Sequence, residues 1–285
     1  FNDPPTTDLN TTQTTLSLHD ALPILDLLSQ KSDITDPKHP LTKIENGSLE
    51  YDIDRFAYEK EATLKDVHFA LKKGQTLGIV GQTGSGKTSL LKLLLREYDV
   101  NQGTIKLNGH DIRQYRLADL RSLIGYVPQD QVLFAMSILD NIRFGDPNLT
   151  FTAVEGATKL SQVYDDIVAM PQGFDTIIGE KGVSLSGGQK QRIAMSRAMI
   201  LNPDILILDD SLSAVDAKTE HAIIENLKKT RQDKTTLITA HRLSAVVHAD
   251  LILVMQDGHI QERGCHDELI QAGGWYAKTY ESQQL

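Results

Sequence analysis

The sequence has 285 residues, 40% of them hydrophobic and 24% charged, so the chain is long enough to bury a core of ordinary composition. Its formal net charge of −9 argues against a free-standing nucleic-acid binder, because a phosphate backbone is normally met by a basic surface. No apolar run approaches the roughly 20 residues needed to cross a bilayer. The single cysteine, Cys265, excludes an internal disulfide and fits a reducing compartment.

The first 24 residues show no pattern of a folded segment. They are rich in threonine, begin without methionine and have neither the helical nor the strand period of hydrophobic residues. We therefore predict that residues 1–24 are disordered or foreign to the gene, and we assign no function to them.

A complete phosphate-binding motif, G-x-x-x-x-G-K-[ST], occupies residues 81–88. The apolar run Leu77–Val80 predicts a buried strand that leads into it. Glycines in such a loop turn backbone N–H groups toward a polyphosphate, and the helix predicted over about 88–95 points its positive end at the same anion. Lys87 can reach the β- and γ-phosphates, and Thr88 can bind Mg²⁺. The alternative is a glycine-rich turn without a ligand.

An apolar run and a threonine-rich run predict two more strands that lead into polar residues. Ile205–Leu208 ends at Asp209, and Thr235–Thr239 ends just before His241. Open α/β sheets place ligand-binding residues at the carboxyl ends of strands, so Asp209 is expected to hold Mg²⁺ from the side opposite Thr88. A histidine after a strand is more often structural, but beside a phosphate loop His241 becomes a candidate contact to the γ-phosphate.

The segment Leu185–Gln189 predicts a helix start with open backbone donors. Ser186 followed three residues later by Gln189 is a capping-box pattern, and the predicted helix runs to about Ile200. The two glycines between them leave the first N–H groups of the helix unobstructed, which makes a second anion site. The alternative is a helix that is merely well capped.

The remaining patterns complete an α/β architecture. Residues 48–112 are expected to be rich in strands, and residues 133–200 to form a helical subdomain. Leu251–Val254 predicts another core strand, and Asp257-Gly258 predicts a turn into a last strand pair. Residues 267–285 are predicted to be helical.

In order and spacing, these motifs resemble those of the nucleotide-binding domain of ABC transporters. The resemblance implies an α/β fold over residues 44–285, with a P-loop NTPase core sheet, an antiparallel β subdomain and an α-helical subdomain. It also implies ATP and Mg²⁺ as ligands. The matching motifs are Walker A (Gly81–Thr88), the Q-loop (Gln129), the signature (Leu185–Gln189), Walker B (Asp209), the D-loop (Ser213–Asp216), the H-loop (His241) and the A-loop aromatic (Tyr58).

The resemblance implies a role for each motif residue. Tyr58 would stack on adenine, although a strand aromatic can also pack on the core. The expected Mg²⁺ ligands are Thr88, Gln129 and Asp209, and the expected catalytic residues are Asp210, His241 and Gln129. The expected nucleotide-binding residues are Tyr58, Gly81, Gly84, Ser85, Gly86, Lys87, Thr88, Ser89, Ser186, Gly187, Gly188, Gln189 and Asp216.

The signature and the phosphate loop together imply a dimer. One chain cannot easily fold both anion sites onto one phosphate, and in the family Ser186 and Gly188 would face ATP held by the opposite subunit. The resemblance therefore implies two ATP molecules sandwiched at a dimer interface.

Asp210 departs from the family pattern, in which active members carry a glutamate that polarises the attacking water. Aspartate is one carbon shorter, so its carboxylate is drawn back by roughly 1.5 Å. A misplacement of about 1 Å can cost on the order of a hundredfold in rate. We expect ATP and Mg²⁺ to bind and turnover to be slow. The alternative is a backbone shift that lets Asp210 act as the base.

A chain whose own site hydrolyses ATP slowly resembles one half of the bacterial heterodimeric multidrug ABC exporters. In these exporters one degenerate site mainly holds ATP and the other site hydrolyses it. The expected partner is then a different ABC chain that carries the catalytic glutamate. The resemblance implies no nucleic-acid partner.

Three segments carry the resemblance to exporters. Leu133–Ile142 is similar to the segment on which the membrane domain docks, although its apolar side chains can also serve the core. Gly179–Gly182 resembles the exporter X-loop. Residues 25–43 resemble the linker from the last membrane helix, so we expect a fragment of a longer half-transporter whose transmembrane domain is missing from this chain. The expected location is the cytoplasmic face of the cell membrane.

Two other functions stay open. One is an ATP-holding regulatory module with no turnover of its own. The other is a soluble ABC ATPase that acts on DNA or ribosomes, which the acidic charge, the docking segment and the lack of a coiled-coil insertion disfavour. The family's substrate contacts belong to its membrane helices, so the sequence does not indicate what is exported.

Overall fold

The structure is a computed structural model, and it describes residues 32–42, 44, 45, 47–179 and 184–284. Residues 1–24, residues 25–31 and 43 of the predicted linker, and residues 180–182 of the predicted X-loop lie outside the described residues. Residues 36–285 form one compact unit, to which all the elements below belong. In the described part of the chain, no helix is long and apolar enough to span a membrane.

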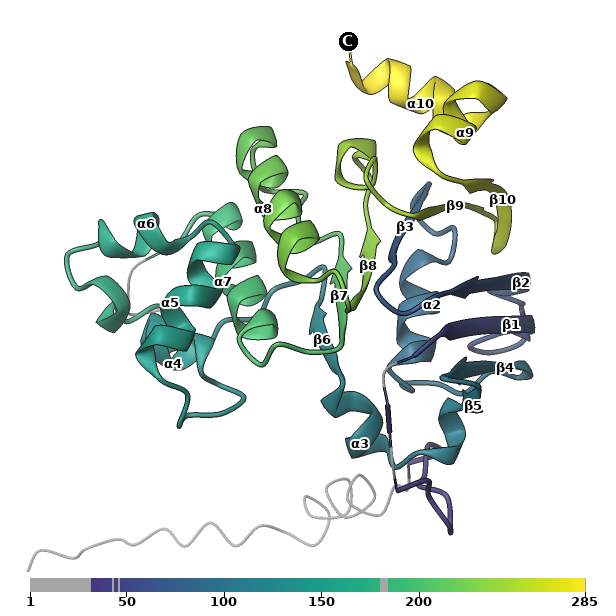
Figure 1. Ribbon diagram of the computed structural model, residues 1–285, viewed down its shortest axis with the longest axis horizontal. Coiled ribbons are helices and arrows are strands. Elements are labelled where there is room, and N and C mark those ends of the chain that lie inside the picture. Colours follow the sequence, from purple (N-terminus) through teal and green to yellow (C-terminus); the bar gives the residue numbers. More distant parts are fainter. Residues whose placement is uncertain (1–31, 43, 46, 180–183, 285) are drawn as a thin grey trace, which may run out of the picture. The chain divides into compact units, whose positions relative to one another are not determined.

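A four-stranded antiparallel sheet forms the β-rich section that the sequence predicts (Figure 1). Its strands are β1 Leu49–Phe56, β2 Leu64–Leu71, β4 Gln102–Leu107 and β5 His110–Asp111. They lie in the order β2-β1-β4-β5. In β1, Leu49, Tyr51 and Ile53 are buried and the residues between them are more exposed, the period of two expected for a strand with one buried face.

The second sheet has six strands and forms the core of the unit. They are β3 Thr76–Gly81, β6 Ile124–Val127, β7 Ile205–Asp209, β8 Thr235–Thr239, β9 Leu251–Gln256 and β10 His259–Gly264. The order is β10-β9-β3-β8-β7-β6, and every pair is parallel except β9 with β10. The predicted mixed α/β fold, with a parallel core sheet and an antiparallel β subdomain, is confirmed.

Helix α2, Lys87–Leu94, follows β3 and lies between the two sheets (Figure 1). Leu90, Leu91, Leu93 and Leu94 are buried in one cluster with side chains from both sheets. Burial of each leucine contributes about 2 kcal/mol. This packing fixes the start of the helix at the carboxyl end of β3.

The helical subdomain predicted over about 133–200 is present. Helix α7 contacts α4 and α5, and Ile138, Val154 and Ile193 from these three helices share a buried cluster. The helices of residues 112–199 are η1 Ile112–Gln114, α3 Leu117–Ser122, α4 Ile138–Ile142, α5 Phe151–Leu160, α6 Tyr164–Val168, η2 Gly173–Asp175 and α7 Gly187–Met199.

The last helices pack on the core sheet through a different cluster. It includes Ile223 of α8, Leu243 of η3 and Tyr276 of α10. The helical region predicted over 267–285 is present as two helices, and Gly273 closes the first of them with a left-handed backbone at φ 65°. These elements are α8 Ala217–Thr230, η3 Leu243–Ala245, α9 His266–Ala272 and α10 Trp275–Gln284.

Two hairpin turns share one backbone form. Asn108-Gly109 joins β4 to β5 with φ values of 53° and 79°, and Asp257-Gly258 joins β9 to β10 with 48° and 81°, as in a type I′ turn. A Cβ added at Gly109 would meet nothing within 4 Å, whereas one added at Gly258 would lie 2.2 Å from the carbonyl oxygen of Thr63. Gly258 also donates its N–H to the carbonyl of Ser85 at 3.2 Å, so this turn supports the phosphate loop.

We predict that Gly258→Ala lowers the free energy of unfolding by about 3 kcal/mol, and Gly109→Ala by about 1 kcal/mol. Both variants place an alanine at positive φ, but only the first also meets a backbone oxygen. Urea unfolding of the two variants measures the difference. Equal losses would contradict the argument, because they would mean that the contact with Thr63 relaxes.

Candidate nucleotide-binding site

A cavity of about 330 Å³ lies at the carboxyl ends of β3, β7 and β8. Parallel α/β sheets bind ligands at this edge. Nine of the predicted site residues line it, together with three threonines outside the predicted set, Thr63, Thr83 and Thr239. The lining residues are Thr63, Thr83, Gly84, Gly86, Lys87, Thr88, Ser89, Gln129, Asp209, Asp210, Thr239 and His241.

The Lys87 ammonium is held inside the phosphate loop. Its Nζ donates to the carbonyl oxygens of Gly81 and Gln82, both at 2.9 Å. Burial lowers the pKa of Lys87 from its ordinary value, and the carboxylates of Asp210 and Asp209 partly oppose that shift. A buried cation that faces mainly neutral oxygens is a favourable partner for an anion.

The loop around Lys87 leaves polar groups open to a ligand. Helix α2 begins after Gly86, which has φ 101° and offers no side-chain cap, and the first N–H groups of a helix have no partner within it. The buried Ser85 hydroxyl has no hydrogen-bond partner in the described part of the chain. A Cβ built on Gly84 would meet nothing within 4 Å. These open donors and this space fit a polyphosphate.

The Asp209 carboxylate is buried, with 2% of the residue exposed, and hydroxyl groups surround it. Thr239 Oγ1 donates to Oδ1 at 2.6 Å, Thr88 Oγ1 donates to Oδ1 at 3.3 Å, and the Tyr126 hydroxyl donates to Oδ2 at 3.4 Å. Burial, and next the negative charge of Asp209, raise the pKa of Tyr126. This oxygen-rich set, with Gln129 nearby on the cavity wall, has the donor chemistry that Mg²⁺ takes beside a phosphate.

The structure explains why Thr239 belongs to this site. In the parallel register of β7 and β8, Asp209 pairs with Thr239, so the hydroxyl lies beside the carboxylate. Thr239 Oγ1 also accepts the N–H of Asp210 at 2.9 Å, and the Thr239 carbonyl accepts it at 3.1 Å. The sequence carried a weak signal for this residue, a hydroxyl at the carboxyl end of a predicted strand, but its partner depended on strand register.

Asp210 has an uncommon backbone conformation, with φ 46°. Among residues other than glycine, aspartate is one of the few that adopt the left-handed region often. The two hydrogen bonds from its N–H to Thr239 hold that conformation at the cavity wall. The direction of its side chain is therefore set by the backbone.

Tyr58 lies beside the phosphate-loop helix and outside the cavity lining. Its hydroxyl donates to Ser89 Oγ at 2.9 Å, and 43% of the residue is exposed. The rings of Phe56 and Tyr98 meet it edge to face, with centroids 4.9 and 4.8 Å away. The ring thus packs partly on the antiparallel sheet and stays accessible beside the loop. Stacking on adenine stays a prediction.

The signature residues do not line the cavity, and the structure shows what they do within the chain. Ser186 Oγ accepts the N–H of Gln189 at 3.2 Å, and Gln189 Oε1 accepts the N–H of Ser186 at 3.0 Å, so the predicted capping box is confirmed. A Cβ on Gly188 would lie 2.9 Å from the carbonyl oxygen of Ala214. The signature helix therefore starts directly against the D-loop.

Asp216 also lies outside the cavity lining. Its Oδ1 accepts the N–H of Thr219 at 3.0 Å and so caps helix α8. The hydrogen bonds with Thr219 lower the pKa of Asp216, which keeps it charged at the positive end of the helix. Its predicted contact with a nucleotide is not tested by this geometry.

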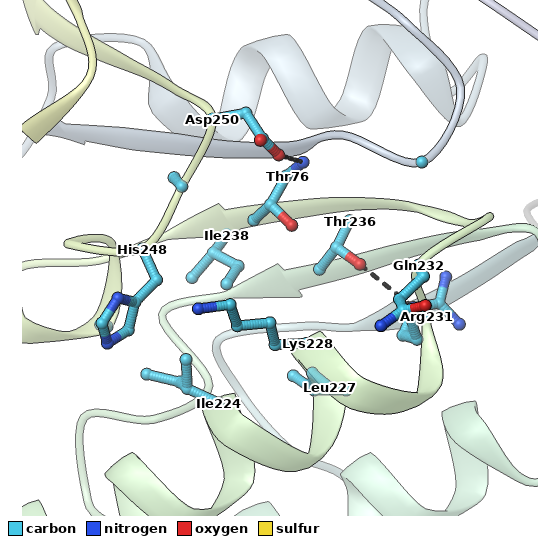
Figure 2. Close-up of a pocket in the computed structure, with 13 residues that line it drawn as sticks. Thr76, Ile224, Leu227, Lys228, Arg231, Gln232, Thr236, Ile238, His248 and Asp250 are labelled. Atoms are coloured by element: carbon cyan, nitrogen blue, oxygen red, sulfur yellow. Dashed lines mark hydrogen bonds between the residues drawn. The ribbon is translucent and has the colours of Figure 1, made fainter.

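A different cavity, of about 290 Å³, lies near the amino ends of β3 and β8. Figure 2 shows Ile224 and Leu227 of α8 on one side of it and Thr76 and Thr236 on the other. It contains no residue of the phosphate loop. It is therefore separate from the site at the carboxyl ends of the strands.

Known proteins that this chain resembles include ATP-binding proteins, in agreement with a phosphate-binding cavity. Residues 64–213 match the family model described as ABC transporter. The probable multidrug resistance ABC transporter ATP-binding/permease protein YheI of Bacillus subtilis (strain 168) is 51% identical over 260 residues, 90% of this chain and 44% of that protein. The multidrug resistance-like ATP-binding protein MdlA of Escherichia coli (strain K12) is 46% identical over 261 residues, 91% of this chain and 44% of that protein.

Among solved structures, a bacterial Atm1-family ABC exporter with ATP bound matches with a TM-score of 0.89 and 36% identity. The match covers 94% of this chain and 48% of that chain. The present chain thus spans less than half the length of these three relatives.

We predict that Thr239→Val lowers the free energy of unfolding by about 2 kcal/mol, because it removes the shortest hydrogen bond to the buried Asp209 carboxylate and the side-chain acceptor of the Asp210 N–H. Thr235→Val on the same strand is the matched control. The Thr235 hydroxyl is buried and has no partner in the described part of the chain, so we expect a change within about 0.5 kcal/mol. Urea unfolding tests both variants, and equal losses would contradict the role of Thr239.

Proposed function

The chain belongs to the ABC transporter family and has its ATPase fold, and we propose that it is the ATP-binding and ATP-hydrolysing part of an exporter subunit. The observation that carries the proposal is the cavity in which Lys87, Asp209 and Asp210 meet. The relatives' names support export, since two are described as multidrug resistance or multidrug resistance-like proteins. The work would be efflux of a substrate, with the domain at the cytoplasmic face of the cell membrane.

ATP is proposed to bind with its phosphates on the loop between β3 and α2. Lys87 and the open N–H groups of α2 would hold the phosphates, His241 would contact the γ-phosphate, and Tyr58 would stack on adenine. Thr88, Gln129 and Asp209 would hold Mg²⁺, which neutralises developing phosphate charge when bound. The proposal is supported by the shared cavity of Lys87, Thr88, Gln129, Asp209 and His241.

Asp210 is proposed to make this chain's own site slow. Its backbone is fixed by Thr239, and its side chain is one carbon shorter than the family's glutamate. Its carboxylate would therefore lie roughly 1.5 Å short of the position that the glutamate carboxylate would reach. Water would then be oriented poorly for attack, while the groups that bind ATP are complete. This supports a heterodimer in which a different ABC chain supplies the glutamate, and in which Ser186 to Gln189 of this chain complete the partner's site.

A second candidate is favoured by the same residue. If Asp210 cannot act as a base in any dimer, the chain would be an ATP-holding module that regulates its partner. The two candidates differ in whether a glutamate at position 210 restores turnover.

We predict that the unaltered chain binds ATP with Mg²⁺ but hydrolyses it slowly, and that Asp210→Glu raises kcat at least about tenfold. Phosphate release at saturating ATP measures turnover, and equilibrium titration measures binding. Asp210→Asn is the matched control, because it has the size of aspartate without the charge. Fast turnover by the unaltered chain that is lost in Asp210→Asn would show that Asp210 is a competent base.

A mixing experiment tests the composite dimer. In the Asp210→Glu background, one chain also carries Lys87→Met, which removes the phosphate-loop cation. The other carries Gly187→Glu, which places a negative charge on the exposed start of α7 with no close backbone contact. We expect neither chain to hydrolyse ATP alone. Mixed, they should recover about a quarter of the activity, since half of random dimers are mixed and each has one intact site. No recovery would contradict shared sites.

A further inference from the structure

The backbone that carries His241 is tied to helix α10 by one side chain. Gln283 Nε2 donates to the carbonyl oxygen of His241 at 2.9 Å, and Gln283 Oε1 accepts the N–H of Leu243 at 2.8 Å. The side-chain amide of Gln283 thus bonds a backbone carbonyl before Arg242 and a backbone N–H after it. The backbone of a neighbouring strand would make the same pair of bonds. The pair of bonds fixes both the position and the rotation of this segment.

The opposite side of the same segment is tied to the D-loop. Arg242 Nη2 donates to the carbonyls of Ser213 and Val215, the second at 3.0 Å, and Nη1 lies 3.4 Å from the buried Glu220 carboxylate. Ser244 Oγ donates to the other Glu220 oxygen at 2.6 Å. The segment after β8 is therefore held between α8 and α10, and His241 is its only residue that lines the nucleotide cavity.

Helix α10 is a firm support for this contact. Tyr276 is fully buried, and its hydroxyl lies 2.9 Å from His266 Nδ1. The Glu262 carboxylate accepts the N–H groups of Trp275 and Tyr276 at the first turn of the helix. Tyr280, one turn before Gln283, packs against the same core cluster. Gln283 thus projects from a helix that is anchored to the core sheet.

We propose that Gln283 is a positioning residue, which sets the reach of His241 toward the γ-phosphate by holding the backbone of His241 and Leu243. The inference rests on the proposed function, because it assumes that His241 contacts the γ-phosphate of ATP. Gln283 itself touches no reacting atom. Loss of its two bonds frees the backbone on one side, so contact with the γ-phosphate weakens while the groups that hold the other phosphates stay in place.

The test is equilibrium binding of ATP and of ADP, each with Mg²⁺, to the full chain. Gln283→Met keeps the length of the side chain and removes both hydrogen bonds. Gln283→Glu keeps the acceptor for Leu243 and loses the donor to His241. Gln284→Met is the control, because in the described part of the chain no hydrogen bond joins Gln284 to this segment. His241→Ala removes the contact with the γ-phosphate entirely.

We expect His241→Ala to reduce the preference for ATP over ADP about tenfold, the effect of one charge-assisted hydrogen bond. Gln283→Met should reduce this preference at least about threefold. Gln283→Glu should reduce it as well, because a carboxylate oxygen would repel the His241 carbonyl, and Gln284→Met should leave the preference unchanged. ADP affinity should be the same in all of them. Hydrogen exchange of the Leu243 amide should accelerate in Gln283→Met and stay slow in Gln283→Glu.

The outcomes separate this inference from the proposed function. An ATP preference in Gln283→Met equal to that of the unaltered chain would overturn the positioning role, and so would an unchanged exchange rate at Leu243. An unaltered chain that binds neither nucleotide would overturn the proposed function and this inference with it. An ATP preference that survives His241→Ala would overturn the contact with the γ-phosphate, and with it the role of Gln283.

Discussion

The buried carboxylate of Asp209 is the interaction on which the site depends. An isolated charge in this position would be costly, and three hydroxyl groups from α2, β6 and β8 reduce that cost. The same hydrogen bonds join the ends of strands that are distant in sequence. Removal of the carboxylate or of its main donor, Thr239, would therefore affect both stability and the geometry around Lys87 and Asp210.

The parallel register of the core sheet places the Asp209 carboxylate beside the other residues of the site. Since β3, β7 and β8 end at one edge, the phosphate loop, Asp209 and His241 are brought together by strand pairing alone. A turn and a helix then hold that edge in place, with Gly258 of the β9–β10 turn bonded to the phosphate loop and Gln283 of α10 bonded to the segment of His241. The cavity is thus a property of the whole unit.

Local patterns account for what the sequence could predict. The phosphate loop, the capping box at Ser186 and the turn at Asp257-Gly258 depend on residues close in sequence, and the structure contains all three. Buried strands were predictable from apolar runs, whereas β6 was not, because Ile124–Val127 is short and contains a glycine. Thr239 and Gln283 escaped prediction since their partners are 30 and 42 residues away, at distances set by register and helix docking.

The proposed function requires that the phosphate-loop cavity bind the polyphosphate of ATP through Lys87. Calorimetric titration of ATP into the unaltered chain and into Lys87→Met tests it most directly. We expect one ATP per chain, with affinity at least about tenfold weaker in Lys87→Met, because a buried cation paired with phosphate is lost. Equal affinity for ATP in the two proteins, with both correctly folded, would contradict it.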